Sequence, residues 1–175
     1  MHSSRKLSLL IVFTFLLAMT PAVGSVPARW RSASETELKS VIPARAPVMK
    51  ENIETEMRSA SGVTDGKGRF IAGVVMITAG YSADGKYSHF FVTQVPIKIG
   101  EMELRPADYV LGYQRVNNDT IKVTFYRASS GEVVGDIDAH PNKKSSVVRS
   151  LMITAPVSGK GGIQIGRYLF DYSIG

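Results

Sequence analysis

The amino-acid sequence predicts an all-β protein, an antiparallel β-sandwich or closed barrel of about seven to eight strands with an N-terminal extended or short-helical arm. Two observations carry this prediction. Apolar and polar residues alternate in many short segments, as in residues 120–127, where Ile121, Val123 and Phe125 share one face. Turn-forming residues separate these segments at short intervals, and no helical pattern lies between them.

The stretch from Phe70 to Gly100 is predicted to form two long strands joined by a tight turn at residues 83–86, where Asp-Gly favours a hairpin. The first strand, residues 70–77, is apolar at both alternating positions. Such a strand is stable only where both of its faces are covered, so other segments must pack on it. Pro96 lacks an N–H donor, so the second strand, residues 87–99, is an edge there, is bulged or changes sheets.

Residues 1–24 have the pattern of a secretory signal peptide. A basic start precedes an apolar run from Leu7 to Met19, and small residues lead up to Gly24. About 13 apolar residues are too few for the roughly 20 that cross a bilayer. We therefore expect cleavage after Gly24, a secreted or periplasmic location, and no membrane span in the mature chain.

The composition excludes several classes of protein. The chain has 175 residues and no cysteine, so it can have neither disulfides nor thiolate metal sites. Of its 21 basic residues, Arg5 and Lys6 lie in the leader, which leaves 19 basic against 15 acidic side chains. This excess is mild, and the sequence shows no clustered basic stripe, so nucleic-acid binding is not predicted.

Residues 25–47 are predicted to form a flexible arm that precedes a single β domain at residues 48–175. Within the arm, Ser34 and Glu37 match a helix capping box, and about two helical turns would end before Pro43. Residues 48–61 fit both a helix and a strand. We favour the strand, because the glycine-rich turn at residues 62–68 would return it onto Phe70.

The remaining chain shows a regular series of strand patterns. The central strand is expected to be covered by strands centred on Val123, Ile137, Leu151 and Leu169. The predicted strands after the central pair are residues 109–116, 120–127, 132–139, 147–153 and 163–172, and a glycine-rich loop is predicted at residues 156–162.

The segment IGEMELRPADYVL, residues 99–111, resembles a motif of small exported bacterial β-sandwich proteins of unassigned function. In that motif a strand ends in glycine, a Leu-x-Pro-Ala-Gly bend follows, and a tyrosine-containing strand resumes. Asp108 stands here where the motif has glycine. The resemblance implies a jelly-roll-like exported β domain and transfers no catalytic residue.

Two groups of residues are candidates for chemistry. Asp136, Asp138 and His140 would lie on one face of a strand at spacings of about 7 Å, and they are plausible ligands for a divalent metal. The same residues also fit an ordinary solvent-facing side of the strand. His89 fits a general base oriented by Asp84 or Asp108, and it also fits a half-buried core histidine, the interpretation we favour.

Aromatic side chains suggest a different kind of site. Tyr109, Tyr113, Tyr168 and Tyr172 would suit a platform for a glycan, a peptide or an apolar ligand, and they also suit an ordinary core. The sequence contains no Gly-x-Ser-x-Gly elbow and predicts no cofactor. We therefore expect a non-catalytic binding or cell-envelope module, the alternative being a metal-dependent or hydrolytic extracytoplasmic enzyme that uses Asp136, Asp138 and His140.

Overall fold

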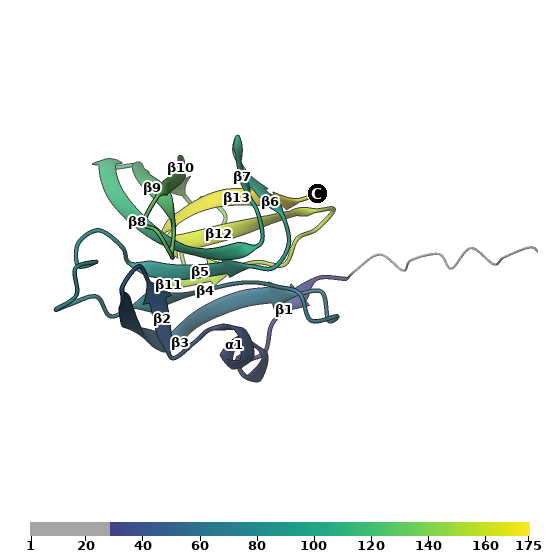
Figure 1. Cartoon of the computed structure of the whole chain (residues 1–175). Coiled ribbons are helices and arrows are strands. Elements are labelled where there is room, and N and C mark those ends of the chain that lie inside the picture. Colours follow the sequence, from purple (N-terminus) through teal and green to yellow (C-terminus); the bar gives the residue numbers. More distant parts are fainter. Residues whose placement is uncertain (1–28) are drawn as a thin grey trace, which may run out of the picture.

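The computed structural model describes residues 29–175, whose antiparallel strands form one sheet that curls into a nearly closed barrel (Figure 1). The strands are β1 (Arg31–Ser32), β2 (Arg45–Val48), β3 (Glu51–Thr64), β4 (Phe70–Met76), β5 (His89–Thr93), β6 (Ile97–Ile99), β7 (Met102–Leu104), β8 (Ala107–Asn117), β9 (Thr120–Arg127), β10 (Val133–Pro141), β11 (Arg149–Ile153), β12 (Lys160–Gly166) and β13 (Tyr168–Ile174). Their order is β1-β3-β4-β5-β8-β9-β10-β13-β12-β11, with β2 paired to β3 and the β6–β7 hairpin paired to β13. The all-β, antiparallel prediction is confirmed.

The barrel closes where β11 meets β3 and β4 through side chains. The backbone N–H of Ile153 donates a hydrogen bond to Ser61 Oγ at 2.9 Å. Leu151 packs onto β4 at Gly73, where an added Cβ would lie 2.9 Å from Leu151 Cδ2. A larger residue at this position would require the Leu151 side chain to shift, and its Cβ would also lie 3.1 Å from the carbonyl oxygen of Phe90.

The sheet buries one apolar cluster on each side of β4. Ile71 points into the barrel, where it joins a cluster that includes Phe91 and Phe125. Ala72 and Val74 point outward and join a second cluster beneath the N-terminal segment and residues 77–88. The expectation that both faces of this strand are covered is confirmed.

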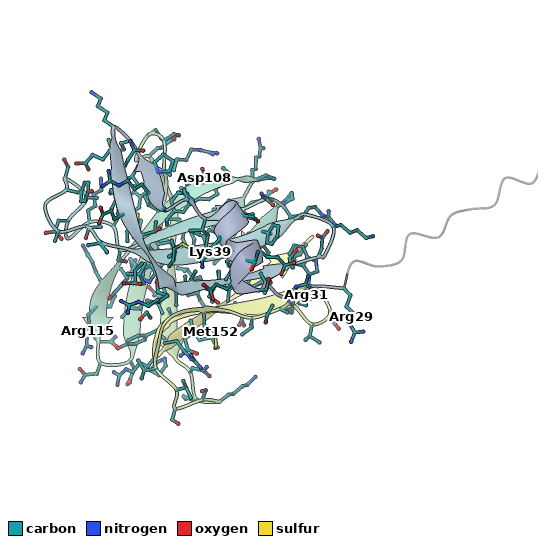
Figure 2. All side chains as sticks on the ribbon, turned by 90° about the horizontal axis from the view of Figure 1, so that it is seen from below. Arg29, Arg31, Lys39, Asp108, Arg115 and Met152 are labelled. Carbon is teal, nitrogen blue, oxygen red and sulfur yellow. The ribbon has the colours of Figure 1, made fainter. Side chains whose placement is uncertain are left out.

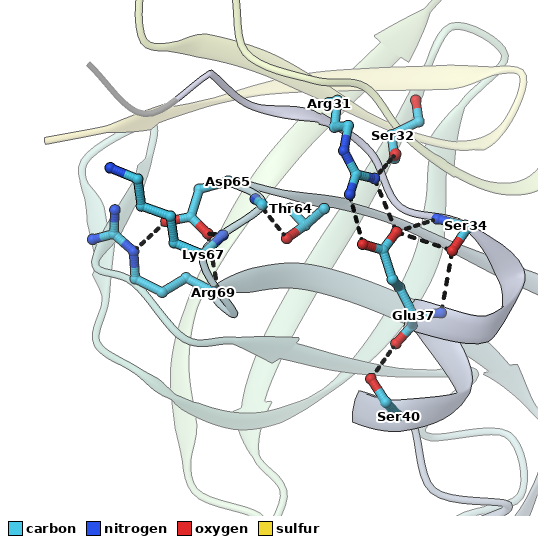
Figure 3. A network of polar contacts seen from close by, with 10 residues as sticks. Arg31, Ser32, Ser34, Glu37, Ser40, Thr64, Asp65, Lys67 and Arg69 are labelled. Carbon is cyan, nitrogen blue, oxygen red and sulfur yellow. Dashed lines mark hydrogen bonds and ion pairs between the residues drawn. The ribbon is translucent and has the colours of Figure 1, made fainter. Parts of the chain in front are cut away.

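The one helix of the described residues, α1 (Glu35–Val41), begins with the predicted capping box (Figure 3). Ser34 Oγ accepts a hydrogen bond from the Glu37 N–H, and the Glu37 carboxylate accepts one from the Ser34 N–H at 2.8 Å. Arg31 donates to the same carboxylate and, as the largest cause, lowers the pKa of Glu37 to about 2. These contacts fix the start of the helix against β1.

The N-terminal segment corrects the prediction of an arm outside the domain. Leu38 and Ile42 on and beside α1, together with Ala46 and Val48 of β2, are buried in the outer cluster. The sequence understates this role because the four apolar residues are divided between a helical turn and a short strand. Residues 25–28 lie outside the described part of the chain.

Thirteen strands are present among residues 29–175, rather than about seven to eight. Four of them, β1, β2, β6 and β7, have two to four residues, too few to show an alternating pattern. The strand expected at residues 163–172 is instead the β12–β13 hairpin, which turns at Gly166 with φ of 62°. The prediction of a strand rather than a helix at residues 48–61 is confirmed for residues 51–61, which lie in β3, while Val48 ends β2 and residues 49–50 form the turn between the two strands.

The hairpin after β4 also differs from the prediction. The tight turn expected at residues 83–86 is replaced by a longer connection over residues 77–88. Ala83 and Tyr87 of this connection are buried in the outer cluster. It lies directly on β8, since a Cβ on Gly112 would collide with the carbonyl oxygen of Lys86. The connection therefore serves as cover for the sheet as well as a turn.

The second half of the central pair changes partners near Pro96. β5 pairs with β4 and β8, whereas β6 pairs with β7 and β13. The predicted strand is therefore interrupted at Pro96, and its second part continues as β6 with other partners in the same curled sheet. Among residues 29–175, no helix is long and apolar enough to cross a membrane, and the leader lies outside the described residues.

We predict that Leu38→Ala lowers the free energy of unfolding by about 2–5 kcal/mol, because it opens a cavity between α1 and the sheet. Lys39→Ala is the matched control on the same helix, since Lys39 is exposed and its pairing with Glu35 is a surface contact of little energetic value. Urea unfolding followed by circular dichroism measures both. Equal stability of the two variants would show that α1 does not contribute to the core.

Candidate functional site

The predicted metal ligands lie on the outer side of β10 and are exposed. Asp136 Oδ1 is 3.5 Å from Lys122 Nζ, and His140 Nδ1 is 3.4 Å from Thr120 Oγ1. Within residues 29–175, no group of three or more histidine, aspartate or glutamate side chains is placed to hold a metal ion. The structure therefore does not bring Asp136, Asp138 and His140 together as one ligand set.

Asp138 and His140 instead line a hollow of about 440 Å³ between β10 and β13. These strands pair only at His140–Leu169 and Pro141–Tyr168 and then diverge. Lys143, Lys144 and Asp171 also line the hollow, so its charge is mixed. The hollow results from the divergence of the two strands.

Three of the four candidate tyrosines belong to the core. Tyr109, Tyr168 and Tyr172 are buried, and their hydroxyl groups donate to the backbone carbonyl oxygens of Arg105 at 2.7 Å, Asn118 at 3.3 Å and Thr154 at 2.8 Å respectively. Burial raises the pKa of the Tyr172 hydroxyl. Tyr113 alone among the four is exposed, so these residues do not make a shared surface platform.

His89 is buried between β5 and β11, and both of its ring nitrogens have partners. Nε2 lies 3.2 Å from the carbonyl oxygen of Ser150, a contact that requires the proton on Nε2. Nδ1 then accepts from Ser88 Oγ at 2.8 Å. The orienting group is therefore a backbone carbonyl, in place of the expected Asp84 or Asp108, and burial lowers the pKa of the imidazole.

The most distinctive surface lies at the end of the barrel formed by the β8–β9, β10–β11 and β12–β13 connections. We call residues 113–121, 142–149 and 166–167 the basic end. It carries five cations and a single acidic residue, Asp119. None of the five forms an ion pair with an acidic group of residues 29–175. The cations are Arg115, Lys143, Lys144, Arg149 and Arg167.

Hydrogen bonds join these three connections into one surface. Arg167 Nη2 donates to the carbonyl oxygen of Asn118 at 2.7 Å, which links β12–β13 to β8–β9. The N–H of Asn142 donates to the carbonyl oxygen of Arg167 at 2.8 Å, which adds the β10–β11 connection. Figure 2 shows Arg115 at the rim of the molecule on the side away from Arg29 and Arg31.

Apolar side chains are exposed between these cations. The exposed fractions are 49% for Tyr113, 56% for Val116, 52% for Val147 and 69% for Val148. Val147 and Val148 directly precede Arg149, and Lys144 lies three residues before Val147. An exposed apolar group rimmed by charge is typical of a surface that contacts a partner.

Sequence reasoning missed this surface because its cations are distributed over three segments that lie far apart in the chain. No single segment forms a basic run. The signal that would have found it is topological, since alternate turns of an antiparallel meander lie at the same end of a barrel. Summing the charges of alternate turns, rather than of neighbouring residues, identifies the basic end.

Comparison with known proteins gives no family for this chain. No family model, curated protein or solved structure matches it. The structure shows a barrel-like β protein whose basic end exposes both cations and apolar side chains.

We predict that the free energy of unfolding falls as the pH is lowered below about 6.5, because unfolded His89 then binds a proton that the buried, neutral imidazole does not. The sign follows from a folded pKa that lies below the unfolded value. Urea unfolding between about pH 7.5 and 5 measures the effect.

The pH effect is tested by comparing variants. His89→Gln is expected to flatten this pH dependence, whereas His140→Gln, which alters an exposed histidine, is expected to keep it. Identical pH profiles for the original protein and His89→Gln would contradict the assignment.

Proposed function

We propose that this protein is an exported, non-catalytic binding module of the cell envelope that contacts an anionic partner through the basic end. One observation carries the proposal: five cations without acidic partners among residues 29–175 lie on one end of the barrel together with exposed apolar side chains. An unpaired cation cluster raises the local potential and attracts anions.

The distribution of charge favours this end over the rest of the surface. Elsewhere, Arg31, Arg45 and Arg69 are held in ion pairs with neighbouring carboxylates. At the opposite end, Lys67, Arg105 and Lys160 form no ion pair within residues 29–175. Exposed charges farther apart than about 8 Å are screened from one another at physiological ionic strength. The basic end is distinguished by its composition, since its three connections carry five cations outside ion pairs and one acidic residue, Asp119.

Export is supported by the leader pattern of residues 1–24. We predict that the protein recovered from the extracytoplasmic fraction of an expressing cell begins at Ser25. Intact-mass measurement and N-terminal sequencing check this. A protein that keeps Leu7 to Met19 would show that the apolar run acts as an uncleaved anchor.

Anion binding is tested by removing three cations from the basic end. We predict that Lys143→Gln, Lys144→Gln and Arg149→Gln together lower affinity for heparin, used as a general polyanion. A plot of log affinity against log salt concentration has a negative slope, and its magnitude is expected to decrease by about three because three ionic contacts are lost. Fluorescence titration at several salt concentrations measures the slope.

A matched control has the same change in net charge at the opposite end of the barrel. Lys67→Gln, Arg105→Gln and Lys160→Gln remove two lysines and one arginine from the β3–β4 connection, the β7–β8 connection and the first residue of β12. This control is expected to decrease the magnitude of the slope by less than one. Equal losses in the two triple variants would mean that net charge, rather than the basic end, determines binding.

A further inference from the structure

We propose that the partner of the basic end is a lipid bilayer that contains anionic headgroups, with Val147 and Val148 inserted among those headgroups. This inference rests on the proposed function, because it takes the basic end as the contact surface. It specifies that the anionic partner is a lipid bilayer and that two side chains enter its headgroup layer. Neither the cations nor the valines alone would lead to it.

The connection that carries the two valines is held from beneath by a buried side chain. Gln164 of β12 is 1% exposed. Its Nε2 donates to the carbonyl oxygen of Val147 at 2.7 Å, and its Oε1 accepts from Asn142 Nδ2 at 3.0 Å. Both sides of the connection are therefore anchored to the barrel wall.

Further bonds within the connection fix its path. The N–H of Lys144 donates to Asn142 Oδ1 at 3.0 Å, and the N–H of Val147 donates to Ser145 Oγ at 3.1 Å. The backbone of this connection therefore forms hydrogen bonds within the protein, while the side chains of Val147 and Val148 are exposed. A contact made by a segment that is already ordered loses less conformational entropy on binding.

The cations surround this apolar tip. Lys143 and Lys144 precede the valines, and Arg149 follows them. Arg167 lies on the neighbouring turn, which contacts Asn142. Val116, on the β8–β9 hairpin, adds a second exposed aliphatic group at the same end. Such an arrangement places cations at the level of lipid phosphates and aliphatic groups below them.

A bilayer fits this arrangement better than a soluble polyanion. A glycan or a polyphosphate would pair with the cations and leave Val147 and Val148 in water. A lipid surface supplies phosphates for the cations and an apolar layer for the valines at once. Charge complementarity and the aliphatic character of the tip therefore point to the same partner.

The test uses the mature chain and sedimentation with phosphatidylcholine vesicles, with or without phosphatidylglycerol. We expect binding to the anionic vesicles that is at least about tenfold tighter than to neutral ones and that weakens with salt. Val147→Ser with Val148→Ser is expected to weaken binding about tenfold. The control, Val133→Ser with Val157→Ser, changes two valines at the opposite end that are at least as exposed, and it is expected to bind normally.

Insertion is measured separately with a unique label. Because the chain has no cysteine, a polarity-sensitive fluorophore can be attached at Val148→Cys alone. Its emission is expected to shift to the blue with anionic vesicles, whereas the same label at Val157→Cys is expected not to shift. The absence of a shift at Val148→Cys would overturn insertion.

The outcomes separate the two proposals. Heparin binding without vesicle binding would overturn the lipid assignment and leave the anion-binding function standing. Equal binding to neutral and anionic vesicles would overturn the lipid assignment as stated. Binding to neither heparin nor vesicles would overturn both. Melting temperatures of the variants, which alter exposed side chains, confirm that each remains folded.

Discussion

The two-sided burial of β4 is the constraint on which the rest of this structure depends. An apolar strand flanked by two hydrogen-bonded neighbours is stable only if both of its faces leave water. Ile71 and Val74 face opposite ways, and each lies in its own apolar cluster. One cluster requires the sheet to curl over itself, and the other requires a separate cover.

Both requirements are met at particular contacts. Curling brings Leu151 onto Gly73, where the missing side chain leaves room for β11. The outer cover comes from α1, β2 and the connection at residues 77–88. That connection is long because Ala83 and Tyr87 have to reach the sheet, which a two-residue turn would not allow. The cover also explains why the capping box of Ser34 and Glu37 matters, since it fixes where α1 begins.

The sequence predicted features that are encoded locally or by a simple alternation. This group includes the all-β antiparallel fold class, the start of the helix at Ser34 and the burial of both faces of residues 70–77. It did not predict short strands such as β6, which contain too few residues for a pattern and depend on the partner that β13 provides. The sequence also did not predict which of the four candidate tyrosines are buried. Alternation assigns a side chain to one face of a strand, but it does not say how far along the strand the core extends.

The candidate surface lies beyond local reasoning for a related reason. No single stretch of the chain is strongly basic, since Arg115, Lys143 and Arg167 come together only through antiparallel pairing. The interior is completed by Tyr168 and Gln164, which anchor the connections partly through side chains of the basic end. Arg167 Nη2 donates to the Tyr168 hydroxyl at 3.1 Å, and Asn142 Nδ2 donates to Gln164 Oε1 at 3.0 Å. Arg167 therefore belongs to both the surface and the scaffold. The side chains of Lys143, Lys144, Val147, Val148 and Arg149 are not among these anchors, so this part of the surface that we assign to binding can change without unfolding the protein.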